Sequence, residues 1–347
     1  TISSDISGRL TATGTTNFSN YILPTTATGV GTITRRSISI NGVTAVTPKV
    51  YDGTTLATLN SGSASLVGLL GADATTVSLD TGGSTGNYSQ AVVGTNLTIT
   101  TAGFALTGTN AENYALTQPT LTGDITPRTL TVTRVTKVYD SLTALPTANS
   151  AYTLGNVVGS DQVYVNAAAV TGGSYASPNA ATGIGVTANN VTLGGSMAFN
   201  YQIAPTLSSA SDFVGVITPK ALTVSIINNP TKTYDATTGF NSTTDNTSPN
   251  TGIGLIDGNG GTTNYQVNGL IGTDAAYITG QSVGTYASVN VLGSGLSTMS
   301  AALTGSNFTF TTGLSSNYSL PTAASGAATI TPRSLVSANI TQVTKVY

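Results

Sequence analysis

Short stretches in which apolar and polar residues alternate recur from one end of the chain to the other. Leu130-Thr131-Val132 is one such stretch, and Leu222-Thr223-Val224-Ser225-Ile226 is another. A period of two is typical of strands that bury one face, and turns rich in Gly, Asn and Ser separate these stretches every ~8–12 residues. No comparable stretch carries a helical apolar stripe. The pattern predicts an all-β chain made of small β-sandwich domains of the Ig-like or a related kind.

Three sequence markers recur in a fixed order and reveal internal repeats. A Lys-x-Tyr-Asp marker has its tyrosine at positions 51, 139, 234 and 347, and an Asn-Tyr marker has its tyrosine at 21, 114, 201 and 318. An Ile-Thr-Pro-Arg marker has its basic residue at 36, 128, 220 and 333, at intervals of 92, 92 and 113 residues. This period suits one sandwich per repeat and disfavours a β-helix, because solenoid coils repeat every ~20–50 residues. A β-grasp-like unit stays open as an alternative fold.

The markers divide the chain into three complete repeats and two partial ones. We expect 1–35 to be the closing part of a preceding repeat, 36–127, 128–219 and 220–332 to be β repeats 1 to 3, and 333–347 to be the opening strand of a following repeat. The third repeat is the longest, and a surface loop at about 241–265 is expected to hold its additional residues. Each seam leaves only 9 to 13 residues between its basic residue and the next marker lysine. We therefore expect a tandem array held end to end as an elongated rod, cut from a longer protein.

Composition argues against several classes of function. Only 7% of the residues are charged, against about 25% in ordinary soluble domains. Without Cys or His the chain cannot build disulfides, thiolate or imidazole metal sites, or Ser-His-Asp and Cys-His catalysis. The net charge of −2 without a basic tract argues against nucleic-acid binding, and no apolar run reaches the ~18 residues of a membrane span. We expect no enzyme activity, no cofactor, no metal, no nucleic-acid partner and no membrane span in this segment.

The few charges are concentrated in the markers. Of the 24 charged residues, 15 lie in Lys-x-Tyr-Asp, in the Ile-Thr-Pro-Arg seam or in a Gly-x-Asp step. Because strand residues alternate faces, Lys49 and Asp52 are expected to point apart, and each marker lysine is expected to pair with the Gly-x-Asp carboxylate of its repeat. The aspartate that follows the marker tyrosine is expected to cap its own turn. The predicted structural motif comprises Lys49, Tyr51, Asp52, Asp73, Tyr114, Arg128, Lys137, Tyr139, Asp140, Asp161, Tyr201, Lys220, Lys232, Tyr234, Asp235, Asp274, Tyr318 and Arg333.

Other interpretations of these residues are open. One lysine near the start of each repeat also suits an intramolecular isopeptide bond to Asn or Asp, which some surface adhesins use in place of disulfides. The Asn-Tyr marker resembles a tyrosine corner, with its hydroxyl bonded to nearby backbone, and it also suits a core tyrosine with a solvated tip. Asp257-Gly258-Asn259-Gly260 has part of a calcium-loop pattern but lacks the alternating ligands and the closing Glu, which favours a plain turn.

Four stretches carry a family resemblance that recurs over essentially the whole chain. They are Lys49-Val50-Tyr51-Asp52-Gly53-Thr54-Thr55, Gly71-Ala72-Asp73, Leu106-Thr107-Gly108-Thr109-Asn110-Ala111-Glu112-Asn113-Tyr114 and Asp124-Ile125-Thr126-Pro127-Arg128-Thr129-Leu130. Together they resemble the YDG-type repeats of filamentous-haemagglutinin-like, two-partner-secreted bacterial surface adhesins. The residue after the marker aspartate is Gly53 in the first repeat but Ser141 in the second and Ala236 in the third. Glycine is therefore favoured at this position but not obligatory.

The resemblance implies an extracellular location at the bacterial cell surface. It implies a structural stalk or fibre segment of a secreted adhesin or matrix filament, which supports attachment and biofilm through reach and stiffness. The expected partners are neighbouring repeats of the same chain, polysaccharide, and other copies that associate laterally into fibres, because a weakly charged β surface lacks one usual protection against edge pairing. The alternative is a glycan-binding β-sandwich module.

Overall fold

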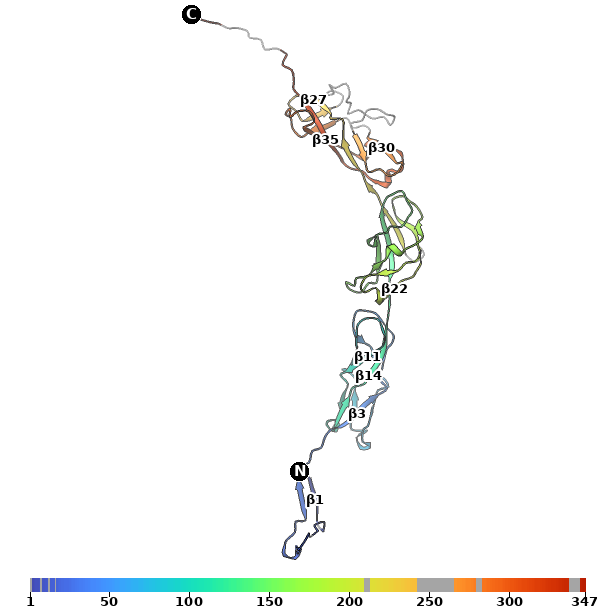
Figure 1. Ribbon diagram of the computed structural model, residues 1–347, viewed down its shortest axis with the longest axis vertical. Coiled ribbons are helices and arrows are strands. Elements are labelled where there is room, and N and C mark those ends of the chain that lie inside the picture. Colours follow the sequence, from blue (N-terminus) through green and yellow to red (C-terminus); the bar gives the residue numbers. More distant parts are fainter. Residues whose placement is uncertain are drawn as a thin grey trace. The chain divides into compact units, whose positions relative to one another are not determined.

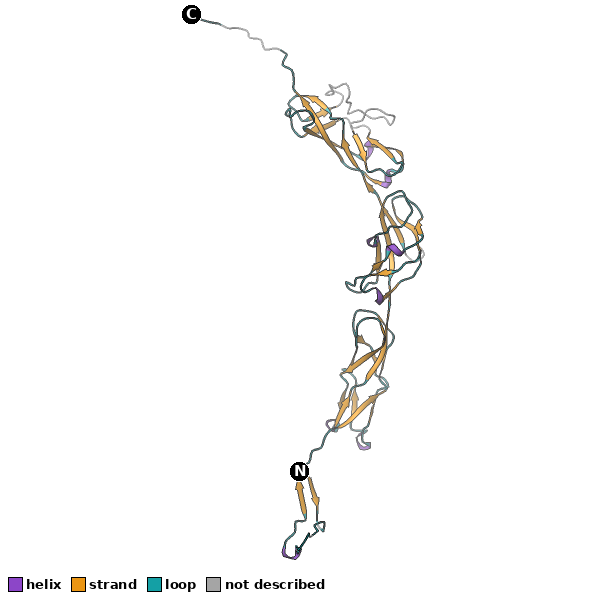
Figure 2. Cartoon of the chain, in the orientation of Figure 1, coloured by secondary structure: helices purple, strands orange, loops and turns teal. Residues whose placement is uncertain are grey.

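A computed structural model describes residues 2–6, 8–11, 13–15, 17–208, 213–241, 265–278, 283–336 and 344–347. Over these residues the chain is all-β, as predicted, with short 3₁₀ turns between the strands (Figures 1 and 2). None of the helical turns in this part of the chain is long and apolar enough to cross a membrane. The chain divides into two compact units, Thr1–Arg128 and Thr129–Tyr347. Most of the predicted 241–265 loop, with its partial calcium-loop pattern, lies outside the described residues.

The first unit contains a hairpin and several small sheets. The hairpin pairs β1 (Ile2–Asp5) with β2 (Thr26–Gly29). The largest sheet has the strand order β5 (Lys49–Val50), β14 (Thr120–Thr126), β11 (Gly94–Ala102), β10 (Thr85–Tyr88), β6 (Leu56–Ala57). A second sheet has the order β13 (Tyr114–Thr117), β3 (Arg36–Asn41), β8 (Ser65–Val67). Two-stranded sheets pair β12 (Ala105–Thr107) with β9 (Ser78–Asp80) and β4 (Thr44–Ala45) with β7 (Leu59–Asn60).

The second unit is built around two larger sheets. One has the order β17 (Tyr152–Gly155), β16 (Thr131–Val138), β24 (Val214–Thr218), β20 (Ala181–Ala188), β19 (Gly173–Tyr175), and β23 (Leu207–Ser208) also pairs with β20. The other has the order β28 (Gly239–Asn241), β31 (Val283–Tyr286), β32 (Ser297–Ala302), β35 (Ala323–Thr331), β26 (Thr223–Ile226), β29 (Tyr265–Asn268), and β27 (Thr231–Thr233) also pairs with β35.

Short strand pairs and 3₁₀ turns complete the units. The pairs are β18 (Tyr164–Val165) with β21 (Leu193–Gly194), β25 (Lys220–Ala221) with β34 (Tyr318–Ser319), and β30 (Ala275–Ile278) with β33 (Phe308–Thr312). Two further strands are β15 (Arg128–Thr129) and β22 (Tyr201–Gln202). The 3₁₀ turns span Phe18–Asn20, Gly71–Asp73, Ala111–Asn113, Asn149–Ala151, Ala167–Ala169, Ala198–Asn200, Gly305–Asn307 and Ser315–Asn317.

In each complete repeat, the strand that ends at the marker runs parallel to the strand that closes the repeat. We call these the marker strand (β5, β16 or β27) and the closing strand (β14, β24 or β35). The register sets each marker lysine opposite the isoleucine of the following Ile-Thr-Pro sequence, in the pairs Lys49–Ile125, Lys137–Ile217 and Lys232–Ile330. A backbone bond then extends each pair, from the N–H of Tyr51 to Thr126, of Tyr139 to Thr218 and of Tyr234 to Thr331. In each complete repeat, the Lys-x-Tyr-Asp marker near its start thus pairs with the Ile-Thr-Pro sequence at its end.

Within the second unit, Tyr139, which follows β16, contacts Asp274, which precedes β30, and Tyr318 of β34. Asp274 Oδ2 accepts the hydroxyl of Tyr139 at 3.0 Å and the hydroxyl of Tyr318 at 2.6 Å. The two tyrosine rings meet edge to face with their centroids 5.4 Å apart. Leu222 and Tyr318 belong to the same buried cluster as Val135, so the core is continuous through this contact.

Hydrogen bonds from one asparagine complete this contact. We call the whole contact, with its tyrosines, its aspartate and this asparagine, the internal joint. Asn317 Nδ2 donates to Asn179 Oδ1 at 3.1 Å, and Asn317 Oδ1 accepts the N–H of Ala180 at 2.8 Å. Asn317 is only 1% exposed, so its amide is removed from water and depends on these partners. The joint thus connects residues of the 128–219 segment to residues of the 220–332 segment within the second unit.

Candidate functional site: a caged lysine and a tyrosine–aspartate pair in each repeat

The marker lysine forms an ion pair with the aspartate three residues after it. The Nζ–Oδ1 distance is 2.9 Å for Lys49–Asp52, 2.7 Å for Lys137–Asp140 and 2.8 Å for Lys232–Asp235. The prediction that lysine and aspartate point apart was wrong, and so was the predicted pairing of the lysine with the Gly-x-Asp carboxylate. The marker strand ends before the aspartate, so the alternation of strand faces no longer applies there.

The aspartate instead closes a tight turn. Its Oδ1 accepts the backbone N–H two residues later at 2.9 Å, as Asp52 does from Thr54 and Asp235 does from Thr237. The predicted capping of the turn is therefore confirmed. This local bond swings the carboxylate back toward the lysine, which sequence spacing alone does not reveal.

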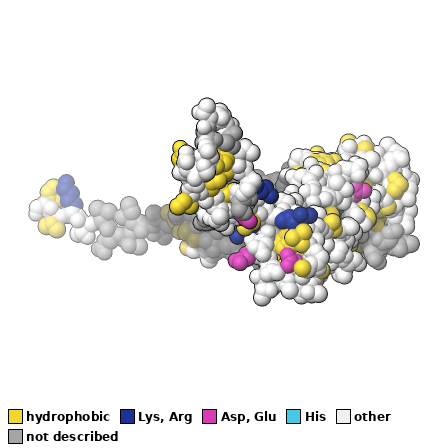
Figure 3. All heavy atoms as spheres, turned by 90° about the horizontal axis from the view of Figure 1, so that it is seen from below, with side chains coloured by type: hydrophobic (Ala, Val, Ile, Leu, Met, Phe, Trp, Pro, Cys, Tyr) yellow, Lys and Arg dark blue, Asp and Glu magenta, His cyan; other side chains and the backbone are white. Residues whose placement is uncertain are grey.

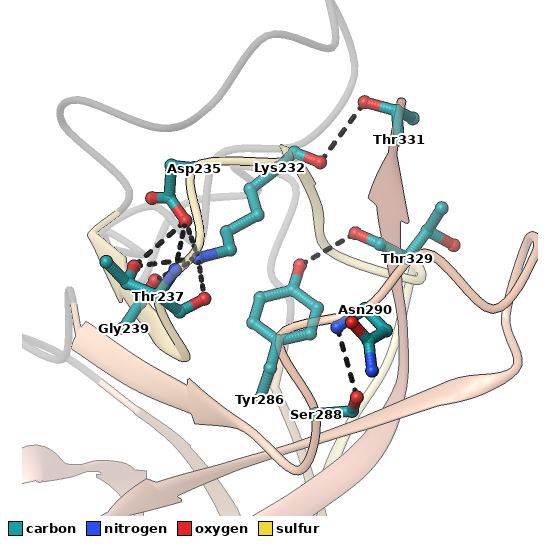
Figure 4. Close-up of polar contacts among 9 residues, drawn as sticks. All are labelled: Lys232, Asp235, Thr237, Gly239, Tyr286, Ser288, Asn290, Thr329 and Thr331. Carbon is teal, nitrogen blue, oxygen red and sulfur yellow. Dashed lines mark hydrogen bonds and ion pairs between the residues drawn. The ribbon is translucent and has the colours of Figure 1, made fainter. Parts of the chain in front are cut away.

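Backbone carbonyl groups fill the remaining places around the ammonium. Lys232 Nζ donates to the carbonyl oxygens of Thr237 at 2.7 Å and Gly239 at 2.8 Å, and it contacts Thr237 Oγ1 at 3.2 Å (Figure 4). Lys49 and Lys137 use carbonyls at the same offsets, five and seven residues downstream. An ammonium has three donor hydrogens, and one carboxylate with two carbonyls provides an acceptor for each.

An aromatic ring covers each ammonium from a distant strand. The lysine nitrogen lies 5.8 Å from the ring centroid of Tyr88, 5.2 Å from that of Tyr175 and 5.5 Å from that of Tyr286 in the three repeats. These are cation–π distances, and a desolvated ammonium gains most from such a contact. All three rings are at most 3% exposed. We call the aspartate, the two carbonyls and the ring the lysine cage.

Burial explains why the cage is complete. The lysine side chain keeps 13% of its exposure in the first repeat, 6% in the second and 1% in the third. A buried ammonium without partners would be strongly destabilising. In return, the hydrogen bond from Lys232 lowers the pKa of Asp235 to about 2, with the N–H of Thr237 acting in the same direction. These contacts are those of an ion pair and give no support to the isopeptide hypothesis.

The Gly-x-Asp carboxylate pairs with the tyrosine of the Asn-Tyr marker. The Tyr114 hydroxyl donates to Asp73 Oδ2 at 2.5 Å and accepts the N–H of Leu70 at 3.2 Å. The same arrangement is formed by Tyr201 with Asp161 and Val158, and by Tyr318 with Asp274 and Ile271. The hydroxyl does accept a backbone N–H, but that N–H lies more than 40 residues upstream, so the pair is not a tyrosine corner, whose backbone partner lies a few residues away.

The paired groups have shifted acidities. The hydrogen bond from Tyr114, followed by that from Asn110, lowers the pKa of Asp73. Burial and the bond to Asp274 raise the pKa of Tyr318 to about 12. The phenol therefore remains a proton donor over the physiological range, and its bond to the carboxylate is charge-assisted.

The other predicted residues lie outside the cage. Tyr51 and Tyr139 are buried, whereas Tyr234 is 37% exposed. Lys220 lies in β25 opposite Tyr318, Arg128 lies in β15, and Arg333 is exposed. The three lysine–aspartate pairs described above are formed by other residues.

The caging tyrosines were missed from the sequence, although a signal for them exists. Each follows a glycine by two residues, as in Gly86-Asn87-Tyr88, Gly173-Ser174-Tyr175 and Gly284-Thr285-Tyr286. The strand glycine Gly215 leaves room for one of these rings, because a Cβ there would lie 2.6 Å from Tyr175. A search for a second repeated tyrosine after glycine would have found all three.

The described residues contain no group of three or more acidic, His or Cys side chains that could hold a metal ion. The chemistry that the arrangement does show is electrostatic. Each cage binds the chain's own ammonium and fixes the turn after the marker strand to the Gly-x-Tyr strand.

Replacing Lys232 with Met should lower the free energy of unfolding of the second unit by about 2–3 kcal/mol, because a carboxylate and two carbonyls lose their donor. The chain has 15 Tyr and no Trp, so tyrosine fluorescence during denaturant unfolding can follow the change. Lys345→Met is the matched control, since Lys345 occupies the same marker position but is exposed. Equal effects of the two substitutions would contradict a role for the cage.

Acid should weaken the third repeat through Asp235. Its pKa is about 2 in the fold and about 3.8 without partners, so the ion pair contributes fully above about pH 4 and is lost as the pH falls toward 2. We expect the unfolding midpoint to fall across this window, and to fall less in Lys232→Met. Parallel pH profiles for the two proteins would show that the pair contributes nothing.

Comparison with protein families matches the YDG domain to residues 34–122 and, separately, to residues 126–209. No curated protein and no solved structure matches the chain. Each matched segment contains one marker lysine with its ion pair and one tyrosine–aspartate pair. The chain therefore contains two successive YDG domains, at residues 34–122 and 126–209.

Proposed function

We propose that this chain is a load-bearing stalk segment of a secreted bacterial surface adhesin of the filamentous-haemagglutinin-like, two-partner-secreted kind. In this proposal residues 36–127, 128–219 and 220–332 are tandem β-sandwich domains arranged as a rod. The observation that carries it is the parallel pairing of marker and closing strands in every complete repeat. The third repeat has the same cage and tyrosine–aspartate pair as the two matched YDG domains.

The parallel pair supports this function through its mechanics. In the second repeat the pairing runs over five positions, from Arg134 opposite Val214 to Val138 opposite Thr218. The chain enters β16 at one end of the pair and leaves β24 at the other. Tension along the chain therefore pulls the strands past each other, and their hydrogen bonds are loaded together. Strands pulled apart from one end would lose those bonds one at a time.

The lysine cage strengthens the same pair of marker and closing strands. Lys137 stands on the marker strand opposite Ile217 of the closing strand, and its ammonium holds the carbonyls of Leu142 and Ala144 in the turn beyond. The ring of Tyr175 lies over the ammonium, and its hydroxyl donates to the carbonyl of Val135 at 3.2 Å. The marker strand is thus fixed by side-chain contacts as well as by the sheet.

The surface chemistry suits an extracellular fibre. Most of the surface on the face in Figure 3 belongs to uncharged polar side chains and backbone, with few charged groups. Such a surface depends little on salt, because it contains few of the exposed charge pairs that weaken as salt rises. Detection of the protein on intact cells by antibody, against a cytoplasmic control, would test the location.

Single-molecule pulling tests the mechanical role. The chain has no Cys, so introduced cysteine pairs give defined attachment points. Thr129→Cys with Lys220→Cys loads the β16–β24 pair in shear, and Leu142→Cys with Lys220→Cys peels it from one end. We expect a clearly higher unfolding force in shear, and a length gain of about 300 Å for the ~90 residues released. Equal forces in the two geometries would overturn the load-bearing proposal.

A further inference from the structure

The opening strand of the second repeat is one continuous strand as far as its marker. β16 runs from Thr131 to Val138 and contains Lys137. β24 pairs in parallel with one edge of β16 over five positions, and β17 pairs with the other edge over four. The hydroxyl of Tyr175 also donates to the carbonyl of Val135 in this strand, at 3.2 Å. Strand pairing and the lysine cage therefore act on the same strand.

The corresponding stretch of the first repeat is divided into separate strands. β3 pairs in parallel with β13 over four positions and antiparallel with β8 over three. β5, which contains Lys49, pairs in parallel with β14 over only two positions. Residues 42–48 lie between β3 and β5, and within them β4 pairs with β7. The lysine cage of this repeat is therefore separated from β3, the strand by which the chain enters the repeat.

A glycine turn ends β3 and creates this division. Gly42 follows β3 directly, has a φ of +81°, and donates its N–H to Asn41 Oδ1 at 2.9 Å. A Cβ on this residue would overlap the carbonyl oxygen of Ser63, so the turn requires glycine. The sequence also makes room for the turn, because the step from the seam to the marker lysine is 13 positions in the first repeat and nine in the second.

The cage of the first repeat also has fewer ties to its marker strand. Among the described residues the buried hydroxyl of Tyr88 has no hydrogen-bond partner, whereas its counterpart Tyr175 is bonded to the marker strand. The side chain of Lys49 is 13% exposed, against 6% for the lysine of the second repeat. One side-chain bond compensates in part, since Thr47 Oγ1 accepts the N–H of Asp124 in the closing strand at 2.9 Å. The β5–β14 pair is thus both shorter and less firmly anchored than the β16–β24 pair.

Tension along the chain therefore takes a different path through each repeat. In the second repeat it enters β16, so the pairing with β24 and the cage of Lys137 are loaded together. In the first repeat it enters β3 and passes to β13, which is joined through residues 118–119 to β14 and so to the end of the repeat. The β5–β14 pair and the cage of Lys49 carry no tension until β3 has detached. The tension then falls on two paired positions, fewer than the four that have just failed.

We propose that the first repeat is the extensible element of this chain and yields to tension before the second repeat. Its cage stabilises the fold, but it lies behind the Gly42 turn and does not reinforce the strand that is loaded. The cage of the second repeat does both. This inference rests on the proposed stalk function and gives the stalk an ordered response to load, in which the first ~90 residues to be released add about 300 Å.

Single-molecule pulling on the full chain tests the order of yielding. Arg35→Cys with Thr129→Cys loads the first repeat, and Thr129→Cys with Lys220→Cys loads the second, in a chain that has no cysteine of its own. We expect a clearly lower unfolding force for the first repeat, in a single step. An equal or higher force for the first repeat, or a second and stronger resistance after β3 has been released, would overturn the inference.

Equivalent lysine substitutions test the load path. Lys137→Met should lower the unfolding force of the second repeat, because its cage is loaded together with the strand pair. Lys49→Met should leave the unfolding force of the first repeat unchanged, although it lowers the denaturant concentration at which the first unit unfolds. Equal loss of force in both repeats would contradict the inference, and so would an unchanged force in the second repeat.

Tyrosine substitutions repeat the test with a smaller change, for the case in which a Lys→Met variant does not fold. Tyr175→Phe removes the hydroxyl bond to Val135 and should lower the unfolding force of the second repeat. Tyr88→Phe removes a hydroxyl that has no partner among the described residues and should leave the force of the first repeat unchanged. A loss of force in Tyr88→Phe, or none in Tyr175→Phe, would count against the inference. The comparison of shear with peeling in the second repeat is independent of the first repeat, so the stalk function and the order of yielding can fail separately.

Discussion

One buried ammonium group in each repeat is the constraint on which the rest of the domain depends. Taking a lysine nitrogen out of water is costly unless acceptors surround it. Lys232, at 1% exposure, has such acceptors only because the chain wraps from the marker aspartate to the carbonyl of Gly239 and brings the ring of Tyr286 over the nitrogen. The requirement thus joins the marker strand, the turn after it and a strand some 50 residues later in the sequence.

The cage and the parallel strand pair support each other. Lys232 stands opposite Ile330 of the closing strand. The hydroxyl of Tyr286 lies between the carbonyl oxygens of Pro230, at 2.8 Å, and Thr329, at 3.0 Å, on the two sides of that pair, and its one proton is shared between them. The lysine charge therefore lies where the marker strand, near the start of each repeat, pairs with the closing strand at its end. A role in joining these two strands explains why the few charges are concentrated in the markers better than a role in separating neighbouring domains.

Local chemistry could be predicted from the sequence, and distant partners could not. Alternation gave the all-β class, and the turn-capping role of Asp52 followed from its position after a strand. The pairing of Lys49 failed because strand geometry was applied to Asp52, two residues past the end of β5 at Val50. Its caging ring, Tyr88, lies 39 residues away in the sequence, and no spacing rule connects the two. The internal joint was likewise beyond reach, because the sequence does not show that Asn179 and Asn317, 138 residues apart, meet beside Tyr139.

Hydrogen exchange measures the central claim most directly, that the cage holds marker and closing strands together. The Tyr234 N–H, bonded to Thr331 of the closing strand, reports on this pair in the third repeat. If the cage fixes the pair, this amide is strongly protected in the wild-type chain and exchanges at least about tenfold faster in Lys232→Met, while amides of the second repeat are unchanged. Fast exchange in the wild-type chain, or unaltered protection in the variant, would contradict it.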